Sequence, residues 1–147
     1  MSSTQNQILQ DIPESARFHL SMVQGIIQRM SANCASCKTW CITIVSALLV
    51  LIADKGKPQF VAVAVIPVVL FLILDAYYLS LEKAFRNAHN SFIKKLHDGN
   101  IAVSDLFAIK PEGNTLKTVC DALISPATWP FYLTLLVMIG LTRFFIG

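Results

Sequence analysis

Three long apolar runs constrain this chain more than any other feature of its sequence. They cover residues 39–53, 60–74 and 129–142, and a charged residue directly follows each of them. A helix that crosses a bilayer needs roughly 20 apolar residues, with a lower limit of about 17. Each run approaches this length once its aromatic and snorkelling flanks are included. The runs therefore predict about three short transmembrane helices.

The low charge content supports the same fold class. Of the 147 residues, 54% are hydrophobic and 14% are charged, whereas soluble domains carry about 25% charged residues. The three runs also leave too little chain for a second large core. We therefore expect an all-α membrane protein. The net charge of +3 is mild and does not by itself indicate a nucleic-acid-binding protein.

Local signals indicate how the helices follow one another. Residues 11–14 have the pattern of a capped helix start, and Phe18, Met22 and Ile26 then form the stripe of an amphipathic helix, which lies on the membrane or packs on other soluble segments. Gly and Pro predict a tight turn at 54–58, and spacing predicts a short amphipathic helix at 116–124. The expected organisation is a cytoplasmic amphipathic helix in residues 1–37, a transmembrane hairpin in 38–79, a cytoplasmic extension with a connecting segment in 80–128, and a third transmembrane helix in 129–147.

The second apolar run continues as a helix that is too long for the membrane alone. Apolar residues recur every three or four positions from Leu74 to Leu96, and no helix breaker occurs before Gly99. A helix over residues 60–97 would measure roughly 57 Å, nearly twice the roughly 30 Å of the hydrocarbon layer. It must project into water with an apolar seam formed by Leu81, Phe85, Phe92 and Leu96. We predict a homo-oligomer built along this seam, with packing on the N-terminal helix as the alternative.

The distribution of basic residues predicts the topology. Nine of the twelve lysines and arginines precede the first apolar run or lie between the second and the third. Cytoplasmic segments next to membrane spans are enriched in these residues. We therefore expect a multi-pass protein of the bacterial inner membrane, with its N-terminus and residues 80–128 in the cytoplasm.

The sequence lacks the motifs of the common enzyme classes, including GxSxG, HExxH and the P-loop. Cys34, Cys37 and Cys41 share one helix face, and we interpret them as reduced, packed thiols, because a metal site would need a second pair of ligands. We therefore expect no catalytic residues, no metal and no cofactor. A small membrane enzyme is the least favoured of the functional hypotheses.

Three residues of the second run are candidates for pore lining or gating. Asp75 ends the run, and an ionisable residue at membrane depth is a functional hypothesis by default. In an oligomer, Asp75 would form an acidic ring that favours cations. The alternative is that it marks the membrane boundary, with Tyr78 as an interfacial anchor. Pro67 lies within the run and is expected to bend the helix.

A basic face follows on the cytoplasmic part of the same helix. One interpretation is a solvated face near anionic lipid. The sharper one is a site for a nucleotide or a single-stranded oligonucleotide, because amide side chains next to basic residues permit contacts to bases as well as to phosphates. The candidate binding residues are Lys83, Arg86, Asn87, Asn90, Lys94 and Lys95.

Residues 29–40 and 74–82 resemble small bacterial membrane proteins of antiphage defence loci, encoded beside nucleotidyltransferase-like genes, and the similarity is to the Hailong-type transmembrane effector. Two-span effectors of nucleotide-signalling systems are similar in layout, although the third apolar run departs from that class. The resemblance implies an oligomeric ion channel that disrupts the membrane during infection, a nucleotide oligomer that holds it closed, and a nucleotidyltransferase-like partner enzyme. The alternative function is a non-conducting membrane scaffold or partner subunit.

Overall fold

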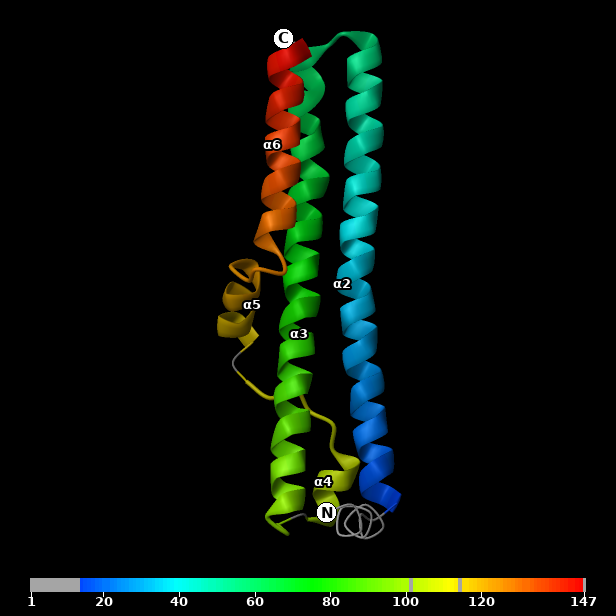
Figure 1. Cartoon of the computed structure of the whole chain (residues 1–147), viewed down its shortest axis with the longest axis vertical. Coiled ribbons are helices and arrows are strands. Elements are labelled where there is room, and N and C mark those ends of the chain that lie inside the picture. Colours follow the sequence, from blue (N-terminus) through cyan, green and yellow to red (C-terminus); the bar gives the residue numbers. More distant parts are fainter. Residues whose placement is uncertain (1–13, 101, 114, 147) are drawn as a thin grey trace, which may run out of the picture.

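The computed structural model describes residues 14–100, 102–113 and 115–146, and all regular structure in these ranges is helical. The predicted helix start at residues 11–14 lies outside them except for Glu14. Figure 1 shows the helices in one elongated bundle. In chain order they are α2 (Glu14–Lys55), the 3-10 helix η1 (Pro58–Ala64), α3 (Val65–His97), α4 (Val103–Phe107), α5 (Thr115–Leu123) and α6 (Trp129–Ile146).

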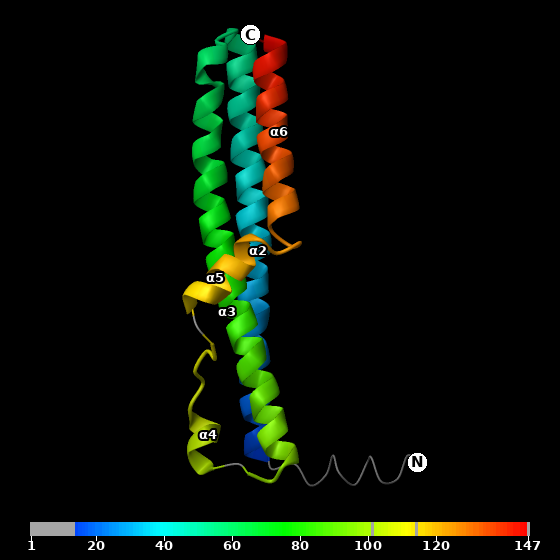
Figure 2. The ribbon, with the colours of Figure 1, turned by 90° about the vertical axis from the view of Figure 1, so that its left-hand side faces the viewer.

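Helices α2 and α3 form an antiparallel hairpin that runs the whole length of the molecule (Figures 1 and 2). Helix α2 alone has 42 residues, which corresponds to roughly 63 Å. The amphipathic helix and the first apolar run, which we expected as separate segments, form this one helix. No helix boundary falls near residue 37, because the small residues that precede it are compatible with helical geometry.

The turn between the two long helices is shorter than the expected 54–58. Helix α2 continues to Lys55, and Gly56 adopts a positive φ of 57° that only glycine accepts readily. The expected helix over residues 60–97 is present, with its first part wound as η1. Pro67 is the third residue of α3, where a missing N–H group leaves no hydrogen bond unmade. The proline thus lies in the first turn of α3, directly after η1.

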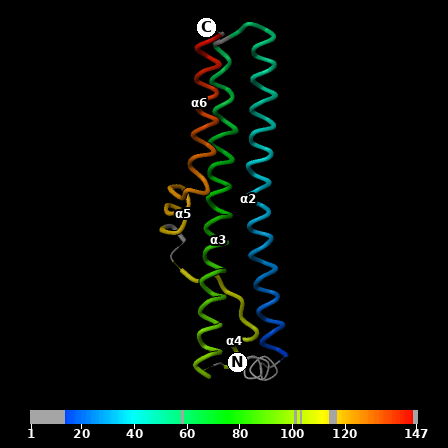
Figure 3. Tube along the Cα trace, in the orientation of Figure 1, coloured from blue at the N-terminus to red at the C-terminus, as the bar shows by residue number. Residues whose placement is uncertain are grey.

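Helix α6 packs along the apolar half of the hairpin and turns it into a three-helix bundle (Figure 2). The chain reaches α6 by way of α4, beside the free ends of the hairpin, and α5, beside the middle of α3 (Figure 3). Helix α5 confirms the short amphipathic helix expected at residues 116–124. The bundle core is formed by Cys41, Val45, Leu49, Ile52, Val61, Ala64, Val68, Tyr132, Leu135 and Ile139.

Two helices, Glu14–Lys55 and Gln59–His97, are long and apolar enough to cross a membrane, while the third apolar helix, Trp129–Phe145, is shorter. Only 28% of the most apolar window of each long helix is buried. Large apolar side chains such as Val50, Leu70 and Phe145 are therefore exposed on the outside of the bundle. A helix from the core of a soluble protein would instead bury such a window.

Candidate functional site

A buried ion pair joins α2 to α3 near the middle of both helices. Lys38 Nζ lies 2.6 Å from Asp75 Oδ2, and the Asp75 side chain is fully buried whereas the Lys38 side chain is 25% exposed. Removing one partner from such a pair costs about 3–5 kcal/mol, because the remaining charge is left buried and unpaired. Asp75 therefore fixes the register of α3 against α2 at this level. The carboxylate faces Lys38 within one chain.

The second carboxylate oxygen of Asp75 has no hydrogen-bond partner. Among the described residues, Asp75 Oδ1 and Thr128 Oγ1 are the buried side-chain oxygen or nitrogen atoms without one. Buried carboxylates normally accept several hydrogen bonds, and an unmatched buried acceptor is unfavourable. The pair is thus only partly satisfied, and Asp75 Oδ1 can accept a hydrogen bond from a further donor.

Three thiols from α2 lie against the same part of α3. Cys34 Sγ approaches the Asp75 carbonyl at 3.7 Å, and Cys41 Sγ approaches the Pro67 carbonyl at 4.0 Å. Cys34, Cys37 and Cys41 are buried and form no disulfide, as the interpretation as packed thiols predicts. No group of three potential ligands that could hold a metal ion occurs within the described part of the chain.

The three residues predicted from the sequence to line or gate a pore differ in their burial and contacts. Asp75 is fully buried and paired. Pro67 lies against Cys41 near the start of α3. Tyr78 is half-buried, and its ring lies 5.7 Å from that of Tyr77.

The predicted basic face divides between two sides of α3. Arg86 and Asn90 line a groove of about 380 Å³ between α2 and α3, together with His89 and three side chains of α2, namely Gln24, Ile27 and Gln28. Apart from Ile27, every lining side chain can form hydrogen bonds, and none is acidic. Arg86 also bonds to Glu82, with Nε 2.9 Å from Oε1. The groove therefore offers one guanidinium, one imidazole and three amides to a ligand.

The other candidates of that face lie away from the groove. Lys95 lines a separate cavity and forms an ion pair of 3.3 Å with Asp105. Lys83 is half-buried, whereas Asn87 and Lys94 are exposed. The structure thus brings Arg86 and Asn90 together with residues of α2, and leaves the remaining four candidates outside that groove.

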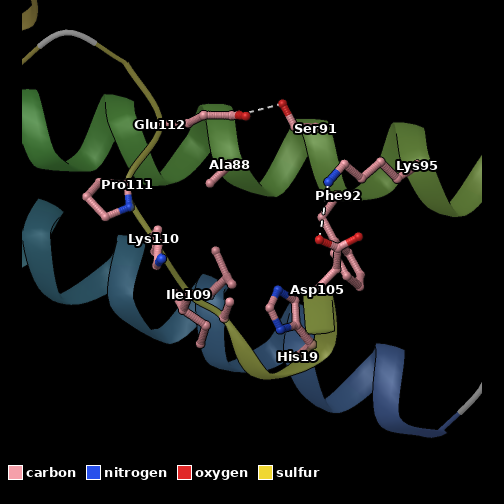
Figure 4. A pocket seen from close by; sticks show the side chains of 12 residues that line it. His19, Ala88, Ser91, Phe92, Lys95, Asp105, Ile109, Lys110, Pro111 and Glu112 are labelled. Carbon is pink, nitrogen blue, oxygen red and sulfur yellow. Dashed lines mark hydrogen bonds and ion pairs between the residues drawn. The ribbon is translucent and has the colours of Figure 1, made fainter. Parts of the chain in front are cut away.

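The segment that contains α4 clasps the ends of the hairpin beside a cavity of about 340 Å³ (Figure 4). His19 Nδ1 donates to the Leu106 carbonyl at 3.0 Å, and its ring stacks on Phe92 at 4.3 Å. Ser91 Oγ donates to Glu112 Oε2 at 2.6 Å. These contacts join α2 to α3, α2 to α4, and α3 to the segment that follows α4.

The contact with His19 shows that Phe92, one residue of the predicted apolar seam, packs on α2. Phe92 is only 6% exposed, because it packs on α2 of the same chain. Leu81, Phe85 and Leu96 are half-buried. Phe92 thus follows the alternative in which the seam packs on the N-terminal helix, and the other three residues retain surface for contacts with a second subunit.

Several residues of these sites were not singled out from the sequence as site residues. Lys38 is one of the basic residues that precede the first apolar run, and Gln24 and Gln28 belong to no motif. Their roles depend on which residues of neighbouring helices lie at the same height, and that information is absent from the periodicity of a single helix. The one usable signal was the charge of Lys38, because an acidic residue at membrane depth requires a partner.

The chain matches no family model, and comparisons with curated proteins and with solved structures found no significant match.

Proposed function

We propose that this protein is an oligomeric ion channel of the bacterial inner membrane, with a cytoplasmic N-terminus, and that the Lys38–Asp75 pair holds it closed. The observation that carries the proposal is the burial of this ion pair between the two longest helices. Charged groups at membrane depth usually face a bundle interior or a water-filled path. Much of the apolar surface of both long helices is exposed on the outside of the bundle, which favours lipid as its environment.

Opening requires the ion pair to separate. With Lys38 in place, the Asp75 carboxylate lies inside a single chain and cannot contribute to a ring shared by several subunits. Once the pair separates and α3 turns, the Asp75 side chains of neighbouring subunits could face a common axis. Such an acidic ring attracts cations. In this proposal the pair is the closed-state latch and Asp75 is the selectivity element of the open state.

The groove beside Arg86 is the proposed ligand site. Its guanidinium suits phosphate, and the amides of Gln24, Gln28 and Asn90 can both donate to and accept from base edges. A nucleotide or single-stranded oligonucleotide bound there would touch both α2 and α3. By tying the helices together, it would favour the closed arrangement, provided that it binds this arrangement more tightly than the open one.

The resemblance to Hailong-type effectors supports a role in antiphage defence. In that setting, a nucleotidyltransferase-like partner enzyme supplies the ligand, and loss of the ligand during infection releases a membrane-disrupting channel. The proposed antiphage role rests on this resemblance, whereas the proposed latch and groove rest on the contacts described above.

Ion flux from liposomes tests the latch. Lys38→Met should raise cation leak roughly tenfold or more, since it leaves Asp75 buried without its partner. The matched control is Lys55→Met at the exposed end of α2, which should leave the leak unchanged. The double variant Lys38→Met, Asp75→Asn should still leak but discriminate less between cations and anions. If no variant conducts, the non-conducting scaffold becomes the better description.

Binding of labelled single-stranded oligonucleotides tests the groove. Arg86→Gln should weaken binding about tenfold, because a charge-assisted contact to phosphate is lost. Lys94→Gln is the matched control, since it removes one positive charge from an exposed site outside the groove. Binding of the parent should fall steeply as salt rises. Equal weakening in both variants would indicate a diffuse basic surface instead of this groove.

A further inference from the structure

Tyr132 of α6 contacts the turn of α3 that precedes Asp75. Its side chain is only 2% exposed, and its hydroxyl donates to the Phe71 carbonyl at 3.1 Å. Phe71 lies one helical turn before Asp75, so this carbonyl is also the regular acceptor for the Asp75 backbone amide. The Tyr132 hydroxyl therefore lies at the turn of α3 that ends at Asp75. Side chains of α2 and α6 thus contact the same turn of α3, Lys38 at Asp75 and Tyr132 at Phe71.

The Phe71 carbonyl and Asp75 Oδ1 differ in whether they already accept another hydrogen bond. The Phe71 carbonyl keeps its bond within α3 whether or not Tyr132 is present. Asp75 Oδ1 is buried and has no donor. A tyrosine hydroxyl carries one proton and serves one strong acceptor at a time. If it moved from the carbonyl to the carboxylate, the buried acceptor would gain a charge-assisted bond and no carbonyl would be left unsatisfied.

We propose that Tyr132 is the substitute donor for Asp75, and that it takes over the carboxylate when Lys38 leaves. This inference rests on the proposed function, because it assigns to α6 the control of the same latch. In the closed arrangement, Lys38 holds Oδ2 and Tyr132 holds the Phe71 carbonyl. In the open arrangement, Tyr132 donates to one carboxylate oxygen of Asp75, and the other oxygen is left to face the axis shared by the subunits. Tyr132 is thus a positioning residue that stabilises the open state more than the closed one.

In this proposal, the role of α6 is to position the Tyr132 hydroxyl relative to Asp75. The helix is shorter than the two long helices, yet Tyr132 is among its most buried residues and lies in the bundle core. A ligand, lipid or neighbouring subunit that shifts α6 would move the donor relative to Asp75. The latch would then respond to the position of α6 as well as to the separation of α2 from α3.

Alkylation of the native cysteines measures how often the latch opens. Cys34 is buried beside Asp75, whereas Cys120 is exposed and serves as an internal reference. The purified protein in lipid nanodiscs is treated with N-ethylmaleimide, and peptide mapping gives the rate at each site. We expect Cys34 in the parent to react much more slowly than Cys120. We expect Tyr132→Phe to slow Cys34 about fivefold further, equivalent to about 1 kcal/mol, without changing Cys120.

The direction of this change separates the possible roles of Tyr132. Faster alkylation of Cys34 in Tyr132→Phe would mean that the hydroxyl only anchors α6 in the closed bundle, and would overturn the proposal. Unchanged alkylation would overturn it as well. The matched control is Thr134→Val, which removes an exposed α6 hydroxyl that bonds to the Pro130 carbonyl. An equal slowing in this control would assign the effect to α6 in general.

A second measurement remains available if Tyr132→Phe does not insert into the membrane. Lys38→Met frees the carboxylate, so the infrared C–O stretch of ring-labelled Tyr132 should shift as its hydroxyl changes partner. Lys55→Met should leave the band in place, and an unshifted band in Lys38→Met overturns the proposal. Neither measurement requires conduction. A protein without ion flux that still shows both effects would contradict the channel and retain the exchange of Tyr132 between its two partners.

Discussion

The two halves of the α2–α3 hairpin are held together by different chemistry. The half that contains α6 has a core of small and branched apolar side chains with one buried ion pair at its edge. The other half has a stacked histidine and phenylalanine, two exposed polar pairs, a cavity and a groove. In the first half, an apolar core is combined with a single buried charged contact. In the second, one buried aromatic stack is combined with exposed polar contacts.

This difference indicates which part of the molecule is suited to a conformational change and which part is suited to binding a ligand. A buried charge left without its partner costs about 3–5 kcal/mol, so the Asp75 carboxylate needs a partner in every arrangement of the bundle in which it stays buried. Exposed pairs contribute about 0–1 kcal/mol each and adjust easily. The polar half is therefore suited to binding, and the ion pair between the halves is suited to switching. The continuity of α2 and α3 through both halves is the mechanical connection.

The largest expected effect concerns the ion pair. Lys38→Met should lower the free energy of unfolding in detergent by about 3–5 kcal/mol, because the Asp75 carboxylate stays buried without its partner. The double variant Lys38→Met, Asp75→Leu should recover most of this loss, since apolar side chains of similar size can replace a buried pair. Denaturation by SDS measures both. A small loss in the single variant would show that Asp75 is solvated or neutral in the protein.

Phe92 should produce the next largest effect, in the polar half. Phe92→Ala should destabilise the protein by about 3 kcal/mol, because it removes a buried ring that stacks on His19. The size of the particle should not change. Phe85→Ala, at a half-buried seam position, should cost less stability and should weaken self-association instead. Size-exclusion chromatography with light scattering distinguishes these outcomes. Loss of the oligomer in Phe92→Ala alone would place Phe92 at a subunit interface.

The sequence predicted the elements far better than it predicted the site. Apolar period and breakers located α3 and α6, and Gly99 marked the end of α3, since such signals act within one helix. Helix α2 continues through residue 37, the expected boundary between the cytoplasmic and membrane segments, because no residue there stops it. The pairing of Asp75 with Lys38 depends on the register between helices. A slip of one turn would place other residues opposite the carboxylate.

Thr128 should give a smaller effect of opposite sign. Its hydroxyl oxygen is buried without a partner just before α6 begins. Thr128→Val replaces the hydroxyl with a methyl group of similar size and should raise the free energy of unfolding by about 1 kcal/mol. Thr134→Val, at an exposed position of α6, should change it by less. A clear loss of stability in Thr128→Val would show that the hydroxyl binds a water molecule or another group.

The smallest effect concerns how the contribution of Asp105, in α4, to folding stability depends on pH. The pKa of Asp105 lies below its ordinary value of 3.8, first because the Ala102 backbone N–H bonds to the carboxylate and second because Lys95 does. Since the pKa is lower in the folded than in the unfolded protein, ionised Asp105 favours the fold above about pH 4, and this contribution is lost as the pH falls through the lower folded value. Thermal unfolding from pH 6 to pH 3 should therefore show a small deficit in Asp105→Asn that shrinks as the solution becomes acidic. Asp98→Asn is the matched control, because Asp98 is an exposed carboxylate just beyond α3. A deficit that stays constant across this range would assign the effect of Asp105 to packing and not to its charge.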